Sequence, residues 1–362
     1  MKKRSILIFF LILTFNLSAF EMQQNQSVEA YRQALQFYDQ TDYGNALKYA
    51  EDAVLYRRQY IENQTEELKK SLSSKQVQKA GKDINQIKAV LEERQEFKSI
   101  NIIDSYLKIK GNDFFHNSIN ELLDYMNKMI VFPEAHKLIG DVYKVEGEYD
   151  FAEEYYQLAL KNCDVLDIPD EKYDILYTLA EISRLRNNLP QMETRLLNIL
   201  VSDTYYMDTG LNNALMNTVK SDKKDSMEKF FNLYRAYSYL SIEAYNQLAA
   251  YYYDYGQKEK ALGFAALSSI TSFSKINDIL SSRNPDYQYK NLSTFFQEVS
   301  FYDDIIEWGN KTKAWVGFNI LAKYTKEMGY KNFSRSLLRV LVQFSPESYW
   351  QKDAVLLLET LD

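Results

Sequence analysis

The sequence predicts an all-α protein in which helical hairpins stack into a solenoid. One spacing recurs along the chain: a small residue, a second small residue twelve positions later, and a helix-packing residue seven positions beyond it. A residue suited to a tight turn stands seven positions after the first small residue in most copies. The 362 residues include only 5 prolines and 11 glycines, which fits long helices and argues against a β-sandwich or barrel.

Two antiparallel helices joined by a short turn explain this spacing. Their backbones approach closely only where neither helix carries a bulky side chain, so small residues have to face each other. Roughly three residues form the turn, where a Gly or Asn accepts a left-handed conformation. The four clear copies have their paired small residues at Ala34 and Ala46, Gly140 and Ala152, Ala249 and Ala261, and Ala322 and Ser334. Their turn residues are Thr41, Gly147, Gly256 and Gly329.

Residues 1–19 are predicted to form a secretory signal peptide. The first four residues carry three positive charges, residues 6–15 are almost entirely apolar, and Ala19 offers a cleavage site. The apolar stretch is short for a membrane span, and an uncleaved anchor stays open as the alternative. The mature protein is therefore expected to be periplasmic or secreted, with no membrane insertion after cleavage.

Residues 20–56 are expected to form the first hairpin, and residues 57–96 have another character. Charged residues dominate this second stretch, while apolar residues recur at helical spacing around Leu68 and around Ile87. Two interpretations fit. Either the second helix of the hairpin extends, turns and returns as a narrow coiled hairpin that projects from the stack, or the stretch is a mobile, solvated helical linker.

The rest of the chain is expected to continue the stack. Residues 97–272 hold further hairpins, some of them degenerate, and the first of these turns at Gly111. Residues 273–314 fit no clean hairpin and are predicted to be irregular or a degenerate copy. Residues 315–362 form a last hairpin followed by a capping helix.

The segment 133–160, PEAHKLIGDVYKVEGEYDFAEEYYQLAL, resembles the tetratricopeptide repeat (TPR), whose length is about 34 residues. The segments 244–267 and 30–54 are similar, and Pro346 stands where the family often ends its second helix. The resemblance implies a right-handed superhelical solenoid in which the first helix of each repeat lines a concave groove. It therefore implies a surface for holding other proteins.

The same resemblance implies which side chains line that groove. Carried over copy by copy, they are Tyr31, Tyr38, Lys137, Asp141, Lys144, Tyr177, Arg184, Asn246, Tyr253, Asn319 and Lys323. Tyrosine suits such a surface because it brings a large contact area and a polar tip. Co-chaperone repeats that clamp a terminal carboxylate pair Lys with Asn, whereas Lys137 is followed here by Asp141, whose charge repels a carboxylate. Ordinary solvent-facing helix is the alternative for each of these residues.

Net charge disfavours two classes of partner. The chain has 43 basic and 50 acidic residues, and the predicted signal peptide removes three of the basic ones. A mature chain about ten units negative is poorly suited to sequence-independent nucleic-acid binding, which needs basic patches. It is also poorly suited to anionic lipid surfaces.

No pattern in the sequence indicates catalysis, a metal site or a cofactor. The chain has two histidines and one cysteine, too few for a usual Cys/His zinc site, and Cys163 has no partner for an internal disulfide. His136 is expected in the core. His116 has too few potential metal ligands near it in the sequence to form a metal site. Carboxylates are plentiful, but no spacing singles out a catalytic pair. We therefore expect no enzyme.

Two functions fit these observations. The first is a non-catalytic protein–protein interaction scaffold of the cell envelope, either alone or as an oligomer, that holds partner segments within a larger assembly. Similar secreted TPR proteins serve outer-membrane assembly, cell-wall complexes and the collar of periplasmic flagellar motors, and the collar is the favoured setting. The alternative is an accessory protein that binds cell-wall glycan or peptide, because aromatic faces stack on sugars.

Overall fold

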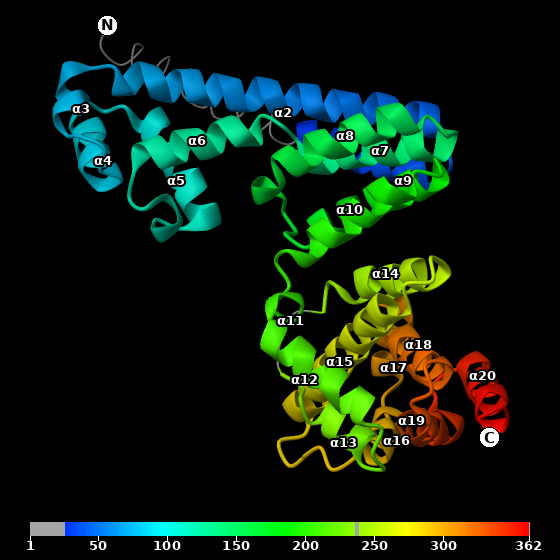
Figure 1. The fold of residues 1–362 in the computed structure, drawn as a ribbon. Coiled ribbons are helices and arrows are strands. Elements are labelled where there is room, and N and C mark those ends of the chain that lie inside the picture. The colour runs from blue at the N-terminus through cyan, green and yellow to red at the C-terminus, as the bar shows by residue number, and fades with distance from the viewer. Residues whose placement is uncertain (1–25, 236–238, 362) are drawn as a thin grey trace, which may run out of the picture. The chain divides into compact units, whose positions relative to one another are not determined.

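The computed structural model describes residues 26–235 and 239–361, and within these ranges it is helical without a β-strand (Figure 1). The predicted all-α class is confirmed. The chain divides into two compact units, Met1–Ile175 (unit 1) and Leu176–Asp362 (unit 2). The predicted signal peptide lies outside the described residues.

Unit 1 begins with a helix over residues 26–39. The helices that follow are α2 (Tyr43–Leu72), α3 (Lys75–Lys79), α4 (Ile84–Glu93), α5 (Phe97–Lys110), η1 (Asp113–Phe115), α6 (Ile119–Met129), α7 (Pro133–Glu146), α8 (Tyr149–Lys161) and η2 (Cys163–Val165). Helix α9 (Glu171–Leu185) carries the chain from unit 1 into unit 2.

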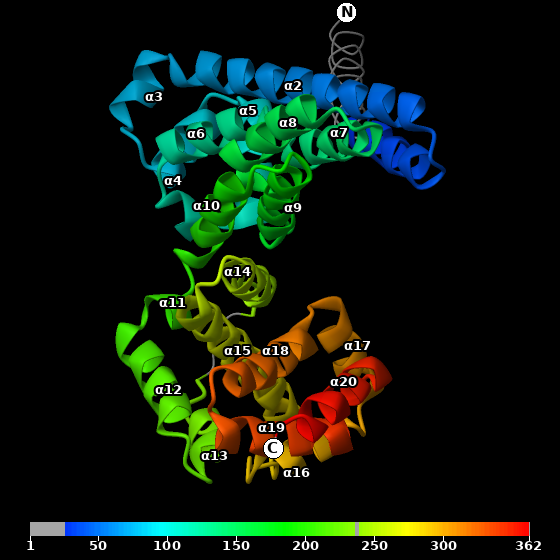
Figure 2. The same cartoon turned by 45° about the vertical axis from the view of Figure 1, so that its right-hand side comes forward.

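Unit 2 continues with a further series of helices. They are α10 (Leu189–Leu200), α11 (Thr204–Met207), α12 (Thr209–Ser221), α13 (Ser226–Phe231), α14 (Ile242–Asp254), α15 (Lys258–Arg283), α16 (Leu292–Val299), α17 (Asp303–Lys311), α18 (Ala314–Glu327), α19 (Lys331–Phe344) and α20 (Ser348–Glu359). Figure 2 shows the α14–α15 and α18–α19 pairs of this unit.

The helices and turns lie where the small-residue spacing predicts them. The four turn residues all have positive φ, from 59° at Thr41 to 84° at Gly329. All eight paired small residues lie within helices and are buried. At the α7–α8 crossing, a Cβ atom on Gly140 would come within 2.9 Å of the Tyr156 ring. At the α18–α19 crossing, the Ser334 hydroxyl donates to the Ala322 carbonyl at 2.9 Å. Small side chains therefore set these helix contacts.

The first two clear hairpins are neighbours in space although residues 73–132 separate them in sequence. Helix α2 packs on α7, and Ala34 and Ala50 share one apolar cluster with Leu138 and Ile139. In unit 2, α10 packs on α14, α15 on α18, and α19 on α20. Within each unit, neighbouring hairpins therefore pack their apolar faces against each other. The segments between these hairpins form additional helices.

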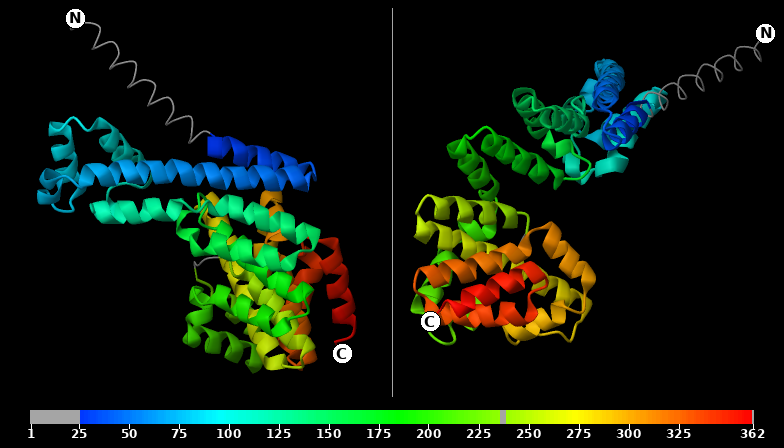
Figure 3. Two further views of the ribbon diagram at one scale, coloured as in Figure 1. Left: turned by 90° about the horizontal axis from the view of Figure 1, so that it is seen from above. Right: turned by 90° about the vertical axis from the view of Figure 1, so that its right-hand side faces the viewer.

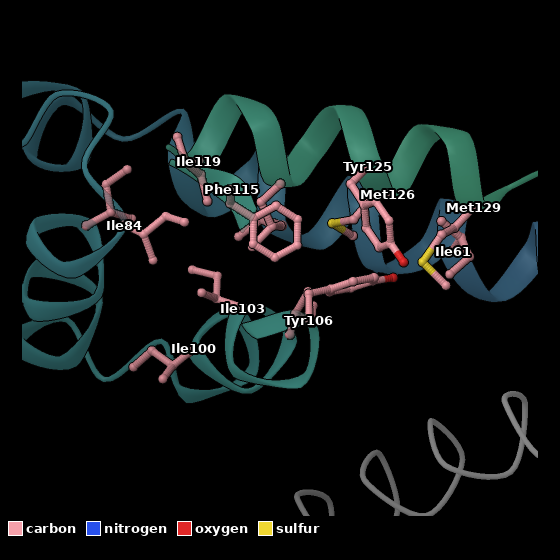
Figure 4. Close-up of a cluster of buried hydrophobic side chains, with 14 of the residues drawn as sticks. Ile61, Ile84, Ile100, Ile103, Tyr106, Phe115, Ile119, Tyr125, Met126 and Met129 are labelled. Carbon is pink, nitrogen blue, oxygen red and sulfur yellow. The ribbon is translucent and has the colours of Figure 1, made fainter. Parts of the chain in front are cut away.

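The structure corrects both interpretations of residues 57–96. Helix α2 does extend, as Figure 3 shows, but the chain does not return as one partner helix. Instead α3 and α4 join α5, α6 and the C-terminal half of α2 around a shared core that includes Leu68, Ile87, Phe115 and Met126. Figure 4 shows Phe115 and Met126, with other side chains of this core, between the helices. Five helices contribute apolar faces to one cluster, which buries more surface than a two-helix hairpin could, so the segment is a small packed subdomain.

Residues 273–314 are more regular than expected. Helix α15 continues without a break to Arg283, and α16 and α17 follow it. Buried aromatic side chains anchor this stretch, because the Phe273 ring lies 4.6 Å from Phe295 and Phe296 lies 5.2 Å from Phe318. Contacts between aromatic rings on α15, α16 and α18 therefore position this stretch, although its sequence shows no repeat spacing.

Candidate functional site

A groove in unit 2 contains two of the predicted partner-binding residues, Tyr177 and Arg184. Its volume is about 640 Å³. Thirteen residues line it: Tyr177, Thr178, Glu181, Arg184, Leu189, Met192, Glu243, Gln247, Ala250, Tyr251, Asp254, Tyr255 and Lys313. We call it the unit 2 groove.

Two helices supply most of its lining. Tyr177, Glu181 and Arg184 follow one another at spacings of four and three residues, which places them on one face of α9. Helix α14 contributes an equivalent face from Glu243 to Asp254. The Tyr177 hydroxyl fixes the two helices relative to each other, since it donates to the Leu240 carbonyl at 2.6 Å and accepts the Ala244 amide at 3.2 Å.

The groove carries charges of both signs. Lys313 forms an ion pair with Glu243, and the Gln247 side chain donates to the same carboxylate at 3.0 Å. Arg184 and Asp254 also line the groove, and Arg184 is exposed. A polar lining with aromatic walls can bind both the backbone and the side chains of a peptide.

The tyrosines beside the groove are held by a carboxylate. Tyr251 donates to Glu193 at 3.1 Å, and Tyr252 bonds the same side chain. Burial and this hydrogen bond both raise the pKa of the Tyr251 phenol. The rings of Tyr251 and Tyr255 lie 4.8 Å apart, and Tyr255 is 55% exposed. The hydrogen bond to Glu193 therefore holds the Tyr251 ring in place, and Tyr255 offers an exposed aromatic surface beside it.

The length of the groove matches a short extended peptide. The α14 face from Glu243 to Asp254 spans about 16 Å at about 1.5 Å per residue. An extended chain rises about 3.3 Å per residue, so roughly five residues would fill this length.

Unit 1 contains, among other predicted residues, Tyr31, Lys137 and Asp141, and three further acidic residues that interact electrostatically with Tyr31, namely Glu134, Asp167 and Glu171; we call these six residues the acidic cluster. Lys137 lies 3.3 Å from Asp141, which also accepts a hydrogen bond from Tyr156 at 2.6 Å. The Asp167 amide donates to Glu134 at 2.7 Å. Burial raises the pKa of Tyr31, and the charges of Glu134, Glu171, Asp141 and Asp167 raise it further.

Two residues expected to be exposed are buried, which corrects their assignment to the groove. Asn246 donates to the Lys313 carbonyl at 3.0 Å and accepts from Ser268 at 2.6 Å. Asn319 donates to the Trp315 carbonyl at 2.9 Å. The neighbouring helices α15 and α18 cover these faces, which spacing within one hairpin could not reveal.

The remaining predicted residues are not among those that line the unit 2 groove. Tyr253 stacks on Tyr324 with ring centroids 4.4 Å apart, and the Lys323 ammonium lies 5.4 Å from the Tyr253 ring. A hydrogen bond to Glu327, together with burial, raises the pKa of Tyr253 to about 12. Tyr38 packs edge-on against Tyr43 at 5.7 Å, and Lys144 is half-buried on α7.

Several groove residues were not found from the sequence. Glu243, Gln247 and Tyr251 are separated by four residues each and continue one helical face, a signal that could have identified them. Lys313 carried no such signal, because it precedes α18 in a left-handed turn and reaches the groove only through tertiary packing.

Within the described residues, no helix has the length and apolar character needed to cross a membrane. In the same part of the chain, no three His, Cys, Asp or Glu side chains are grouped in a way that could hold a metal ion. His136 is buried, as expected of a core residue, with its Nδ1 atom 2.7 Å from the Phe132 carbonyl oxygen.

Comparison with known proteins finds two similar sequences. An uncharacterized protein of Treponema pallidum (strain Nichols) is 29% identical over 282 residues, which cover 77% of this chain and 75% of that protein. An uncharacterized protein of Borreliella burgdorferi is 23% identical over 272 residues, which cover 65% of this chain and 81% of that protein. No protein-family model matches the chain.

Proposed function

We propose that this protein is a non-catalytic, TPR-like scaffold of the cell envelope that binds extended segments of partner proteins. The unit 2 groove carries the proposal. It is lined mainly by α9 and α14, each the first helix of a hairpin, and it contains Tyr177 and Arg184, two of the residues that the TPR resemblance implies for partner binding. Its length, aromatic walls and mixed charge suit a peptide of about five residues.

The setting that we propose is a periplasmic assembly, with the collar of a flagellar motor as the favoured one. Hairpins that bury their faces against one another leave long helix surfaces available for several partners. The predicted signal peptide supports an envelope location. The choice of a periplasmic assembly and of the motor collar rests on analogy with other secreted TPR proteins. The partner therefore has to be identified experimentally.

Site-specific photo-crosslinking in cells tests this function. A photoreactive phenylalanine analogue at Arg184 or at Gln247 would lie in the groove, and one at Lys331, which is exposed on α19, serves as the matched control. We expect the two groove positions to capture the same envelope protein and the control position not to capture it. Adducts that are absent at both groove positions, or identical at all three, would refute the proposal.

Glycan binding is supported by one observation and remains the second candidate. The rings of Tyr251 and Tyr255 present neighbouring aromatic surfaces at the groove, and sugars stack on such surfaces. Isothermal titration of the mature chain with cell-wall glycan fragments tests it. Heat that disappears in a Tyr255→Ala variant supports this candidate, whereas no heat with the wild type rejects it.

A further inference from the structure

A second pocket lies in unit 2, where α11 and α12 pack on α15 (Figure 1). Its volume is about 220 Å³. The residues that line it include Tyr206, Leu215, Met216, Lys260, Gly263 and Phe264. None of its lining residues also lines the unit 2 groove, so it is a separate site. We call it the α12–α15 pocket.

A glycine keeps this pocket open. Gly263 lies within α15, and a Cβ atom on it would meet no atom within 4 Å. Every other residue from 261 to 274 is buried, whereas Gly263 is partly exposed. Glycine is a poor helix former, and here neither a positive φ nor a close contact requires it. The consequence of this glycine is therefore the open space beside it.

The pocket has the size of one aromatic side chain. Phe264 and Tyr206 form an aromatic wall, with ring centroids 6.2 Å apart and an interplanar angle of 15°. Met216 adds a flexible thioether that adapts to the shape of a ring. A cavity of about 150 Å³ holds a benzene molecule, whereas sites for drug-sized ligands begin at about 300 Å³. A volume of about 220 Å³ therefore fits one anchoring side chain better than a free metabolite.

The lining of the pocket carries one charge, which is positive. Lys260 is exposed, and its Nζ atom lies 4.8 Å from the centroid of the Tyr252 ring. It forms no ion pair with an acidic residue of the described chain. The adjacent Glu259 is already paired with Lys220 of α12 at 2.7 Å. An unpaired cation beside an apolar pocket favours a ligand with a carboxylate next to its apolar group.

We propose that the α12–α15 pocket binds a phenylalanine side chain of a partner protein that is followed directly by an acidic residue. The phenyl ring would lie against Phe264, and the carboxylate would lie beside Lys260. Aromatic side chains that fill a pocket of matching size supply much of the free energy of protein–protein binding. The site is additional to the unit 2 groove and does not depend on the function proposed for that groove.

Nuclear magnetic resonance with short peptides tests this inference. The mature chain is labelled with carbon-13 at its methionine methyl groups. Met216 lines the α12–α15 pocket and Met192 lines the unit 2 groove, so one spectrum reports on both sites. The probes are acetyl-Phe-Asp-amide, acetyl-Phe-Asn-amide and acetyl-Ala-Asp-amide.

We expect acetyl-Phe-Asp-amide to shift the Met216 signal with a dissociation constant on the order of 1 mM, because one buried ring and one exposed ion pair contribute modestly. Acetyl-Phe-Asn-amide should bind about threefold more weakly, and acetyl-Ala-Asp-amide should give no saturable shift. Equal affinities of any two of these peptides, or a saturable shift at Met192 and none at Met216, would overturn the inference.

A pair of glycine variants locates the binding site. Gly263→Leu fills the pocket and should abolish the response of Met216 to acetyl-Phe-Asp-amide. Gly44→Leu is the matched control, because the Cβ position of Gly44 on α2 is equally open. It should leave the response unchanged, and an equal loss in both variants contradicts the inference. Gly263→Ala adds a single methyl group and should weaken binding, which covers the case in which Gly263→Leu does not fold.

A pair of lysine variants tests the role of the charge. Lys260→Gln should remove the preference for Asp over Asn in the peptide and retain binding of the phenyl ring. Lys258→Gln is the control, since Lys258 is exposed on the same helix but does not line the pocket. A preference that persists in Lys260→Gln would mean that another group binds the carboxylate, which overturns the inference. The crosslinks at the unit 2 groove test the scaffold function separately, so either proposal can fail alone.

Discussion

Individual glycines decide how closely the helices of this protein approach. A Cβ atom on Gly317 of α18 would lie 2.4 Å from the Ser268 hydroxyl oxygen and 3.1 Å from the Ser268 backbone carbonyl carbon on α15. The Ser269 hydroxyl donates to the Gly317 carbonyl at 2.8 Å across the same contact. Gly263 of α15 is also helical, but nothing lies within 4 Å of its Cβ position. The same residue type therefore serves a packing role in one helix and none in the other.

We expect the same substitution to have opposite effects at these two glycines. Gly317→Ala forces α15 and α18 apart and should lower the free energy of unfolding by about 1–3 kcal/mol. Gly263→Ala should raise it by about 0.5–1 kcal/mol, because alanine is the better helix former and the space is open. Urea unfolding of unit 2, followed by hydrogen exchange of its peptides, measures both. A Gly317→Ala variant that is more stable than the wild type would show that α15 and α18 leave room for the added methyl group.

Glu134 makes a stability contribution that depends on pH. Burial raises its carboxyl pKa above the ordinary value of 4.5, so the folded state binds this proton more readily than the unfolded state. The resulting contribution to stability is present below pH 4.5 and is lost as pH rises through the raised folded value.

Glu134→Gln should therefore stabilise the protein at pH 7 relative to the wild type, because the variant buries no charge. The difference should shrink towards zero as pH falls below the unfolded value, where the wild-type side chain is neutral in both states. Thermal melts at pH 7 and pH 4 measure it, with the exposed Glu93→Gln as the control. A wild-type advantage at pH 7 would indicate that Glu134 has a cationic partner within the protein.

Among the structural elements, the hairpin turns follow local rules and the segments between hairpins do not. Three of the four clear turns use glycine at positive φ, but the first uses Thr41 at φ 59°. A β-branched residue is strained there. The segment with α11 to α13, in contrast, is held by distant contacts: Asp203 accepts from Tyr245 at 2.6 Å, and the Tyr205 hydroxyl lies 2.5 Å from that of Ser274.

Replacing Thr41 should reveal the strain in the first turn. Thr41→Gly should stabilise unit 1 by about 1 kcal/mol, because glycine adopts the left-handed conformation without steric cost. Thr41→Asn should give a smaller gain, and Thr41→Val should give none. Chemical unfolding of the three variants establishes the order. A Gly variant less stable than wild type would mean that the entropy of the unfolded chain outweighs the relief of strain.

The protein as a whole contains two compact units, and each has its own buried core. Phe115 is fully buried in the cluster that includes α3 to α6, and its ring lies 5.6 Å from Tyr125. Phe296 is buried in unit 2 among Phe295, Trp315 and Phe318. A cavity in one of these cores removes contacts from that unit alone.

We expect Phe115→Ala to cost about 3–5 kcal/mol and to reduce amide protection in the helices of unit 1. Phe296→Ala should have the reciprocal effect on unit 2. Hydrogen exchange with mass spectrometry follows both units in one experiment. Equal loss of protection throughout the chain from either variant would show that the two units unfold as one.

The amino-acid sequence was sufficient to identify the helices, the turns and the small residues at four hairpin crossings. These features depend on interactions within about 20 residues, where helix geometry and left-handed turn conformations leave few alternatives. Tyr177, Arg184, Lys137 and Asp141 were also predicted, because they follow a regular position in the first helix of each hairpin, and their role in partner binding stays a prediction.

The neighbours of each hairpin could not be inferred in the same way. Packing across long sequence separations buries Asn246 and Asn319, brings Lys313 into the unit 2 groove and gathers α3 to α6 into one core. It also leaves Glu134 buried beside Tyr31, 103 positions away in the chain. Burial and charge depend on every element that packs against a residue, so spacing along one helix cannot predict them.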